Sequence, residues 1–576
     1  MDALKDLLRN ALHEMGRGRY AEAVALLEPH AQVASNELQR YLGESLRRSG
    51  RVQDAIGPLM QALALKIDDV DAYLQLAFAL QSLQMKAEAA ECFRTVAALR
   101  PDSVMAQAYQ AHGDQQCARW LDFDENLRAL HAVIRAKPDD ADDEFGVPFA
   151  LATLPHEAAD LLKVARLSTR FLSRGIAALP PVTAVDKPKL RIGYLSSDFH
   201  AHATAALMVE VLECHDRERF EVLLFSHGPD DGSPLQQRVR AACERFIDVG
   251  DLDPAGIAAR MRAEGVDIAV DLKGHTAGSR FIALAARPAP VQVAWLGFPG
   301  TCGADFIDYV IGDAIVTPLD EAPFYAERIA QLPRCYQPGD ATRRIEPTPR
   351  AELGLPDDAV VLLSANVVLK ITPTVFDAWM TILHRLPQAL LWQFSGGEQA
   401  DAQLRAEAAS RGIAPERIVF MPPVGMAEHW NRLAAADVAL DTWPCNGHTT
   451  TSDALAAGVP VVTLRGEGFA SRVAESLLVQ AGLFGLVCDT PEAYVDKICA
   501  LASRAVQAGQ VDQSDQADQS DQADQADQAD RALPAIPAWI DSPAFARDLE
   551  ALYERMWTRA VAGLPPEALQ AGRSGN

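Results

Sequence analysis

The densest group of chemically capable side chains lies at residues 441–453, with the sequence DTWPCNGHTTTSD. This segment follows an apolar run that ends at Leu440 and precedes a helical stretch. Free N–H groups at the start of a helix carry partial positive charge, and His448, Thr449 and Thr450 add further hydrogen-bonding groups there. The segment therefore predicts a diphosphate-binding site, although Ser and Thr are also favoured helix caps.

Two more side chains are expected at the same edge of the fold. Lys370 follows an expected strand at 360–364 and precedes a helix for which Pro373 suits the first position. A lysine at the carboxyl end of a parallel strand faces the ligand crevice, where it can neutralise a departing phosphate. The alternative is a solvated lysine at a helix start. His429 is predicted in a strand-to-helix turn on the same side, with a surface histidine as its alternative.

The preceding part of the chain holds three turns that can face a substrate. His202 lies in the turn at 196–204 and can act as a general base or contact a sugar. The turns at 273–278 and 297–303 contain glycines that leave room beside a ligand, although glycine also serves ordinary tight turns. No HExxH, GxSxG, Walker lysine or DxD motif stands at an expected strand end, and no further zinc ligands accompany Cys445. We therefore expect protein groups, and no metal, to meet the charge of a phosphate.

Strands and helices must alternate to position these residues. From Lys189 onward, short β-branched runs alternate with helical stretches, which predicts parallel sheets covered on both faces. The strands expected before a Pro-rich linker at 338–349 are 190–195, 220–225, 267–272, 291–296 and 309–311, and those expected after it are 360–364, 390–394, 418–421, 438–440 and 461–464. Two doubly wound halves joined by a linker enclose a cleft.

The N-terminal part repeats with a 34-residue period. Six positions match across one period, namely Leu42, Gly43, Leu46, Ala55, Leu59 and Ile67 with Leu76, Ala77, Leu80, Ala89, Phe93 and Pro101. The pattern is typical of tetratricopeptide repeats, in which paired antiparallel helices interlock and stack into a superhelix. An ordinary helical bundle with accidental periodicity is the alternative. The concave face of such a stack usually binds peptide.

Composition excludes several classes of partner. The net charge of the 576 residues is −25, which opposes binding to nucleic acid or to an anionic membrane surface. No apolar run approaches the roughly 20 residues of a membrane span, and the N-terminus does not resemble an export signal, so we expect a cytoplasmic protein. The nine cysteines stand singly, which predicts buried thiols and no disulfide framework. Residues 512–530 carry seven aspartates at every third position without a large apolar residue, which predicts disorder.

These features predict six segments. They are repeats at 1–116, a helical joint at 117–185, one Rossmann-like half at 186–342, a second at 343–506, a disordered spacer at 507–533, and a C-terminal helix packed on the body within 534–576.

Four motifs in this order resemble the protein O-GlcNAc transferases: residues 190–199, residues 287–301, Lys370-Ile371 and residues 445–450. The resemblance extends over nearly the whole chain. It implies a GT-B fold and an inverting, metal-independent transfer of N-acetylglucosamine from UDP-GlcNAc to Ser or Thr hydroxyls of intracellular proteins. The implied partners are the nucleotide sugar and a protein acceptor that binds in the repeat groove, and no cofactor is implied.

The same resemblance suggests a role for each candidate residue. His202 matches a histidine that faces the donor sugar and the acceptor, and Lys370 matches the lysine that binds the departing diphosphate. His429 matches a histidine stacked near the uracil. The remaining matches are His448, Thr449 and Thr450 for the phosphate loop, Asp453 for the ribose, and Thr276, Gly300 and Thr301 for the sugar side.

Departures from the family pattern leave alternatives open. Val367, Met426 and Lys273 replace polar residues of the animal members, and the string at 370–373 also resembles plant relatives that transfer fucose from GDP. A protein O-fucosyltransferase is therefore the alternative enzyme. His202 is the favoured base, with Asp198 or a donor phosphate oxygen as alternatives. The non-enzymatic alternative is a tetratricopeptide adaptor with a degenerate transferase half.

Overall fold

The computed structural model describes residues 2–514, 540–570 and 572. The chain divides into two units, Met1–Pro138 with Glu144–Ala150 and Asp139–Asp143 with Leu151–Asn576. The division falls inside the joint predicted at 117–185, so that α8 belongs to the first unit and α10 to the second.

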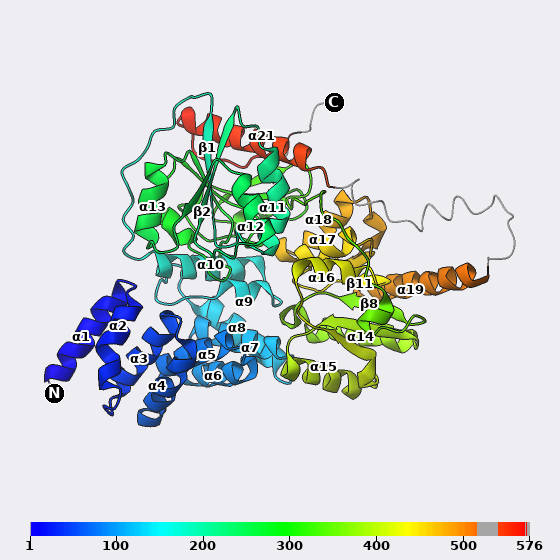
Figure 1. Cartoon of the computed structure of the whole chain (residues 1–576), viewed down its shortest axis with the longest axis horizontal. Coiled ribbons are helices and arrows are strands. Elements are labelled where there is room, and N and C mark those ends of the chain that lie inside the picture. The colour runs from blue at the N-terminus through cyan, green and yellow to red at the C-terminus, as the bar shows by residue number, and fades with distance from the viewer. Residues whose placement is uncertain (1, 515–539, 571, 573–576) are drawn as a thin grey trace. The chain divides into compact units, whose positions relative to one another are not determined.

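The first unit is a series of helices that recur every 34 residues (Figure 1, blue to cyan). Ser35, Asp69 and Ser103 cap the N-termini of three successive odd-numbered helices, and each side chain accepts a hydrogen bond from the N–H three residues further on. Small residues lie where paired helices cross, since a Cβ on Gly43 would approach the Leu59 side chain to 2.5 Å. The sequence-predicted period is thus confirmed. The helices are α1 (Asp2–Gly16), α2 (Tyr20–Leu27), α3 (Asn36–Arg48), α4 (Val52–Leu65), α5 (Val70–Ser82), α6 (Lys86–Leu99), α7 (Val104–Gln116) and α8 (Phe123–Ala136).

One of the matched repeat positions does not pack. Ile67 is 78% exposed in the turn between α4 and α5, whereas Leu59 on α4 is fully buried. The interpretation of Ile67 as a packing residue was wrong, because the turn carries it away from the face that the two helices share.

Two helices follow within the predicted joint, α9 (Pro148–Ala152) and α10 (Ala158–Ser173). α10 fixes the turn at 297–303 in the second unit. Thr169 donates a hydrogen bond to the carbonyl of Cys302 at 2.7 Å, and Gly303 lies so close that a Cβ there would approach the Arg166 nitrogen to 2.4 Å. Gly303 also has φ +65°, so both space and backbone conformation require glycine.

The first half of the second unit is a seven-stranded parallel sheet with strand order β3-β2-β1-β4-β5-β6-β7. Apolar clusters cover its two faces. Its strands are β1 (Leu190–Ser196), β2 (Phe220–Ser226), β3 (Arg245–Asp248), β4 (Ile268–Asp271), β5 (Val291–Ala294), β6 (Tyr309–Asp313) and β7 (Arg328–Leu332), and its helices are α11 (Ala203–Cys214), α12 (Pro234–Ala241) and α13 (Pro254–Ala263).

The second half is a six-stranded parallel sheet with strand order β10-β9-β8-β11-β12-β13. Its strands are β8 (Val360–Ser364), β9 (Ala389–Phe394), β10 (Ile418–Met421), β11 (Val438–Leu440), β12 (Val461–Leu464) and β13 (Val487–Cys488), and its helices are α14 (Pro373–Arg385), α15 (Glu398–Ser410), α16 (Met426–Leu433), α17 (Thr449–Ala456), α18 (Val473–Gln480) and α19 (Pro491–Ser514). Repeats followed by two doubly wound halves confirm the predicted fold class.

Short 3₁₀ helices lie between the longer elements. They are η1 (Glu28–His30), η2 (Phe281–Ala286), η3 (Leu319–Phe324), η4 (Arg350–Leu353), η5 (Val368–Lys370), η6 (Pro415–Arg417), η7 (Phe469–Ser471) and η8 (Phe484–Leu486).

The ten strands predicted from the sequence are present, and three more were missed: β3, β7 and β13. All three lie at sheet edges. β3 and β7 each begin with an exposed arginine, and β13 has two residues, so none shows the continuous apolar run by which buried strands are predicted.

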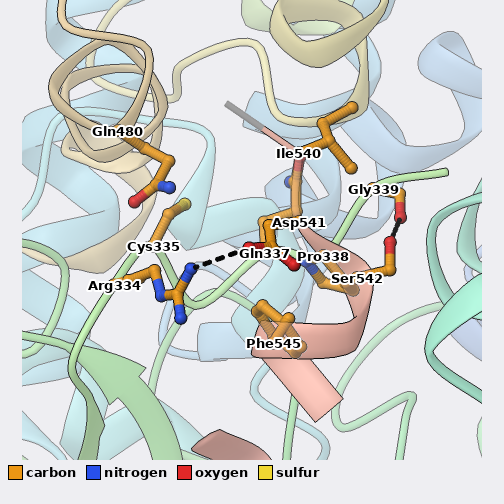
Figure 2. Close-up of a pocket in the computed structure, with 10 residues that line it drawn as sticks. All are labelled: Arg334, Cys335, Gln337, Pro338, Gly339, Gln480, Ile540, Asp541, Ser542 and Phe545. Atoms are coloured by element: carbon orange, nitrogen blue, oxygen red, sulfur yellow. Dashed lines mark hydrogen bonds and ion pairs between the residues drawn. The ribbon is translucent and has the colours of Figure 1, made fainter. Parts of the chain in front are cut away.

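The C-terminal helix α21 (Ser542–Val561) returns to the first half of the second unit (Figure 1, red). Ser542 donates to the carbonyl of Gly339 at 2.9 Å, Arg334 lies 3.9 Å from Asp541, and the ring of Phe545 stacks on Trp295. Figure 2 shows the residues around this helix start, which enclose a cavity of about 20 Å³. That volume has room for little more than a water molecule, so the contact is structural.

A buried polar network fastens the same helix. One oxygen of Glu550 accepts hydrogen bonds from the His215 ring at 2.9 Å and the Asp216 N–H at 2.7 Å. The other ring nitrogen of His215 lies 3.0 Å from the hydroxyl of Tyr194. Glu550 and His215 are both almost fully buried, so loss of Glu550 would leave Nδ1 of His215 and the Asp216 N–H without an acceptor.

The acidic tract lies almost entirely outside the described residues. α19 continues to Ser514, so its backbone is helical through the first eight positions of the spacer predicted at 507–533. The nine cysteines are free and seven of them are buried, as predicted.

Candidate functional site

The candidate residues follow strands at the centre of each sheet. In the first sheet the strand order reverses between β1 and β4, and in the second between β8 and β11. Ligands of doubly wound sheets bind beyond the carboxyl ends of the strands at this reversal. His202 follows β1 and Thr276 follows β4, whereas Lys370 follows β8 and His448 follows β11.

Buried polar side chains shape the loop between β11 and α17. Asp441 accepts hydrogen bonds from the Gly447 N–H at 2.5 Å and the Thr463 hydroxyl at 2.6 Å, and burial raises the pKa of Asp441 to about 6. The side-chain amide of Asn446 donates to the Thr442 carbonyl at 2.9 Å and accepts from the Ala474 N–H at 3.3 Å. These bonds hold the loop in one conformation. Asp441 and Asn446 were not predicted as site residues, although both stand in the motif.

Lys370 lies against this loop. Its Nζ donates to the carbonyl of Asn446 at 2.6 Å from the end of η5. His448, at the N-cap of α17, contacts the Ala470 carbonyl through Nε2 at 3.4 Å. Burial, together with the charge of Lys370, holds the pKa of His448 well below its usual value, so this imidazole is neutral.

Thr449 and Thr450 open α17, where backbone N–H groups lack partners within the helix. The hydroxyl of Thr450 donates to Asn366 at 3.0 Å, which links α17 to the residues after β8. The structure therefore brings Lys370, His448, Thr449 and Thr450 together, and the group can surround an anion with positive and hydrogen-bonding groups.

His429 does not lie in a turn, contrary to the prediction. It lies in the first part of α16, because the helix begins at Met426. Its Nδ1 accepts from Arg432 at 2.9 Å and its ring meets the edge of Phe394 with centroids 6.1 Å apart. Burial, reinforced by Arg432, lowers the pKa of His429 to about 4, so it offers a neutral ring.

Asp453 is a buried carboxylate on α17 with a partner that the sequence did not reveal. It forms an ion pair with Arg343 from the linker between the halves, and both side chains are less than a tenth exposed. The guanidinium of Arg343 also lies 4.0 Å from the ring centre of Trp430. Burial raises the pKa of Asp453, although Arg343 opposes this. Arg343 stands 110 residues before Asp453 in the chain, so no local pattern could pair them.

His202 caps the N-terminus of α11, where its Nδ1 accepts from the Thr204 N–H at 3.1 Å. The same nitrogen lies 3.5 Å from Asp198, and both oxygens of Asp198 lie 2.9 Å from Nζ of Lys273. Burial lowers the pKa of His202, and Lys273 and His200 act in the same direction while Asp198 opposes them. This group belongs to the first half, whereas Lys370 and His448 belong to the second.

The hydroxyls of the two threonines predicted on the sugar side donate hydrogen bonds within the protein. The hydroxyl of Thr276 donates to the Lys273 carbonyl at 2.8 Å, and that of Thr301 donates to the buried Glu327 at 2.7 Å. Gly300 and Thr301 nevertheless line a cavity of about 430 Å³. The cavity is bounded by the start of α10, by residues near η3 and by residues 467–472 of the second half.

Contacts between the halves fix this arrangement. Arg472 of the second half pairs with Glu321 of the first at 2.8 Å, and Ser476 donates to Asp313 at 2.6 Å. Ser452 on α17 also donates to Gln337. Helix α17 is thus bonded to residues of both halves.

None of the described helices is long and apolar enough to cross a membrane. Within the same residues, no group of three or more His, Cys, Asp or Glu side chains is arranged to hold a metal ion.

The two parallel doubly wound sheets, with polar loops at their strand reversals, have the architecture of the GT-B class of glycosyltransferases. Residues 178–347 and 339–513 match the family model of glycosyl transferase family 41. The chain belongs to glycosyl transferase family 41.

Relatives with known names support this placement. A probable UDP-N-acetylglucosamine–peptide N-acetylglucosaminyltransferase, SEC of Arabidopsis thaliana, is 37% identical over 57% of this chain and 34% of its own length. The corresponding transferase of Caenorhabditis elegans is 28% identical over 66% of this chain and 41% of its own. A probable transferase of rice, SPINDLY, is 31% identical over 68% and 42%. The chain thus spans between a third and under half of the length of these relatives.

A solved structure is similar over almost its full length. A mutant of the O-GlcNAc transferase of Thermobaculum terrenum superposes with a TM-score of 0.73 and 29% sequence identity, covering 92% of this chain and 98% of that one.

Proposed function

We propose that this protein is an inverting, metal-independent glycosyltransferase that transfers N-acetylglucosamine from UDP-GlcNAc to Ser or Thr hydroxyls of proteins. The observation that carries the proposal is the position of Lys370, whose ammonium lies 2.6 Å from the Asn446 carbonyl beside the N-terminus of α17. The names of the relatives agree with this donor and with a peptide acceptor.

The site residues suit a direct displacement. An acceptor oxygen attacks the anomeric carbon, the bond from that carbon to the diphosphate breaks, and the configuration inverts. The hydroxyl proton of the acceptor passes to an oxygen of the departing diphosphate. Negative charge grows on the leaving UDP. Lys370 has three N–H donors, of which one contacts Asn446, so others can meet that charge. The backbone N–H groups at the start of α17 are donors that are already oriented before the reaction, and the hydroxyl of Thr449 can add another, whereas the hydroxyl of Thr450 donates to Asn366.

The other candidate residues bind the rest of the donor. We assign the neutral ring of His429 to the base, the carboxylate of Asp453 to the ribose, and Thr276 with Gly300 and Thr301 to the sugar side. His202 faces the sugar and the acceptor. The acceptor is a protein, which we place in the groove of the 34-residue repeats.

The donor can be tested by thermal stability. A ligand that binds only the folded protein raises its unfolding temperature with concentration. We expect UDP and UDP-GlcNAc to stabilise the protein more than UDP-glucose or GDP-fucose does. Stabilisation by GDP-fucose and GDP but not by UDP would favour the fucosyltransferase alternative, to which residues 370–373 also point.

The role of Lys370 can be tested by Lys370→Met, with Lys497→Met on α19 as a control of equal charge change in the same half. Loss of one preorganised donor to a developing anion lowers kcat by about 10²–10³-fold. We expect that loss for K370M with a smaller change in UDP affinity, and wild-type turnover for K497M. A wild-type protein that neither binds a nucleotide nor differs from K370M would indicate the adaptor alternative.

A further inference from the structure

A buried ion pair between Lys273 and Asp198 lies next to His202, and the proposed function assigns it no role. Nζ of Lys273 lies 2.9 Å from both oxygens of Asp198, and each side chain is 7% exposed. Lys273 comes from the turn after β4 and Asp198 from the turn after β1, so the pair joins the two strands at which the sheet order reverses.

The carboxylate of Asp198 is fully occupied by this arrangement. Besides Lys273, the Ser197 hydroxyl donates to one oxygen at 2.7 Å and the Thr204 hydroxyl to the other at 3.3 Å. Burial opposes ionisation of Asp198, but His202, Lys273 and Ser197 together outweigh it and lower the pKa of this carboxylate. Asp198 is therefore held in its charged form, and both of its oxygens already have donors.

The ring of His202 is consequently in a defined tautomer. A neutral imidazole has one N–H donor and one acceptor nitrogen. Nδ1 accepts from the Thr204 N–H at 3.1 Å, so the proton must be on Nε2. A proton on Nδ1 would instead point at the Thr204 N–H. Only an attraction to Asp198, 3.5 Å away, could stabilise it there, and Lys273 already neutralises the charge of Asp198.

We propose that Lys273 is a positioning residue for the transfer reaction, which holds Asp198 as an ion pair and thereby keeps the proton of neutral His202 on Nε2. In this state His202 offers an N–H to a substrate oxygen and has no free nitrogen lone pair with which to remove the acceptor's proton. The inference rests on the proposed function for its catalytic meaning, but the tautomer itself does not.

The charged groups around His202 allow a direct test. Its titration depends on Asp198 after β1, on Lys273 after β4, and on His200 in its own turn, whose ring centre is 5.6 Å away. Removing the charge of Lys273 leaves Asp198 unpaired beside the imidazole, which favours a proton on Nδ1.

The experiment is NMR of the full-length protein with ring-labelled histidine, in which H202Q identifies the signals of His202 among the 13 histidines. We expect the Nε2–H tautomer in the wild type. In K273M we expect the titration midpoint of His202 to rise by about one pH unit or more. Above that midpoint we expect the neutral ring to carry its proton on Nδ1. K273R keeps a cation and should restore the wild-type spectrum.

A second variant guards against misfolding of K273M, in which a carboxylate is buried without its partner. D198N/K273M removes both charges together, and we expect the wild-type tautomer and midpoint. An Nδ1–H tautomer in the wild type, or an unchanged His202 in folded K273M, would overturn the inference. Failure of UDP to bind the wild type would instead refute the proposed function and leave the tautomer result intact.

Discussion

Gly447 provides a sharp test of the proposed diphosphate site, because its missing side chain leaves room for the loop before α17 to pack against Thr450 and Thr451. A Cβ at this position would lie 2.6 Å from the hydroxyl oxygen of Thr450, 2.7 Å from that of Thr451 and 3.2 Å from the side-chain oxygen of Asn366. The substitution Gly447→Ala therefore pushes on both threonines and on the residue to which Thr450 is bonded.

The cost follows from these distances. Relieving the overlap requires the hydroxyls to move by roughly 1 Å to reach ordinary contact distance. Overpacking of this kind costs about 1–3 kcal/mol. It also strains two hydrogen bonds, from Thr450 to Asn366 at 3.0 Å and from Thr451 to the Gly447 carbonyl at 2.8 Å, each worth about 1 kcal/mol. These costs lower the stability of the free and the bound protein alike. Binding weakens only to the extent that the displaced loop misplaces the donors at the start of α17, for which we expect UDP affinity to fall by about 10–100-fold, or about 1.4–2.8 kcal/mol.

Calorimetric titration of G447A with UDP measures this loss. Gly425→Ala is the matched control, since Gly425 also precedes a helix of the same half, has φ −60° and has no atom within 4 Å of an added Cβ. G425A should bind UDP as the wild type does. If G447A also bound UDP with wild-type affinity, the loop before α17 would not be the diphosphate site.

Three further substitutions test other parts of the structure. Asp271 is almost fully buried, one of its oxygens has no partner among the described residues, and burial raises its pKa to about 7. The folded state therefore holds this proton more tightly than the unfolded state, and the wild type loses unfolding free energy as pH rises from about 4 to 7. D271N has no such proton. In denaturant titrations its unfolding free energy should therefore rise relative to that of the wild type by up to about 1.4 kcal/mol per pH unit over this range. Glu550→Ala removes the acceptor of a buried ring and a backbone amide and should cost about 2–4 kcal/mol of unfolding free energy, whereas Glu554→Ala, at an exposed ion pair, should cost less than about 1 kcal/mol; equal losses would contradict the network. Arg343→Met leaves Asp453 without its cation, and we expect about 3–5 kcal/mol of destabilisation by the same titration, while an unchanged midpoint would show that the pair contributes nothing.

The sequence predicted those parts of the fold in which local pattern and burial agree. Strands at the sheet centres are continuous apolar runs, and the 34-residue period repeats both the caps and the small residues at helix crossings. Edge strands such as β3 were missed because their exposed residues are polar, and these residues interrupt the apolar run by which a strand is recognised. Ile67 was misread because periodicity identifies a position in the repeat and not whether it faces a neighbour.

The site was predictable to a similar degree. Lys370 and His448 could be placed together because both follow strands and the rule for doubly wound sheets brings strand ends to one edge. The partners of Asp198 and Asp453 could not be predicted, since Lys273 and Arg343 reach them from elsewhere in the chain. His429 was predicted in the turn before a helix, whereas it lies in α16. The start of α16 at Met426 was not recognised because no capping side chain marks it.

Mass spectrometry of proteins co-expressed with this chain tests the central claim most directly. Parallel cultures would express the wild type and Lys370→Ala, with equal amounts of folded protein verified in each. We predict N-acetylhexosamine on Ser or Thr residues of proteins in the wild-type culture and its loss with K370A. The absence of any sugar modification with the wild type, or an equal modification with K370A, would contradict the assignment of Lys370 and its loop as the centre of a protein glycosyltransferase.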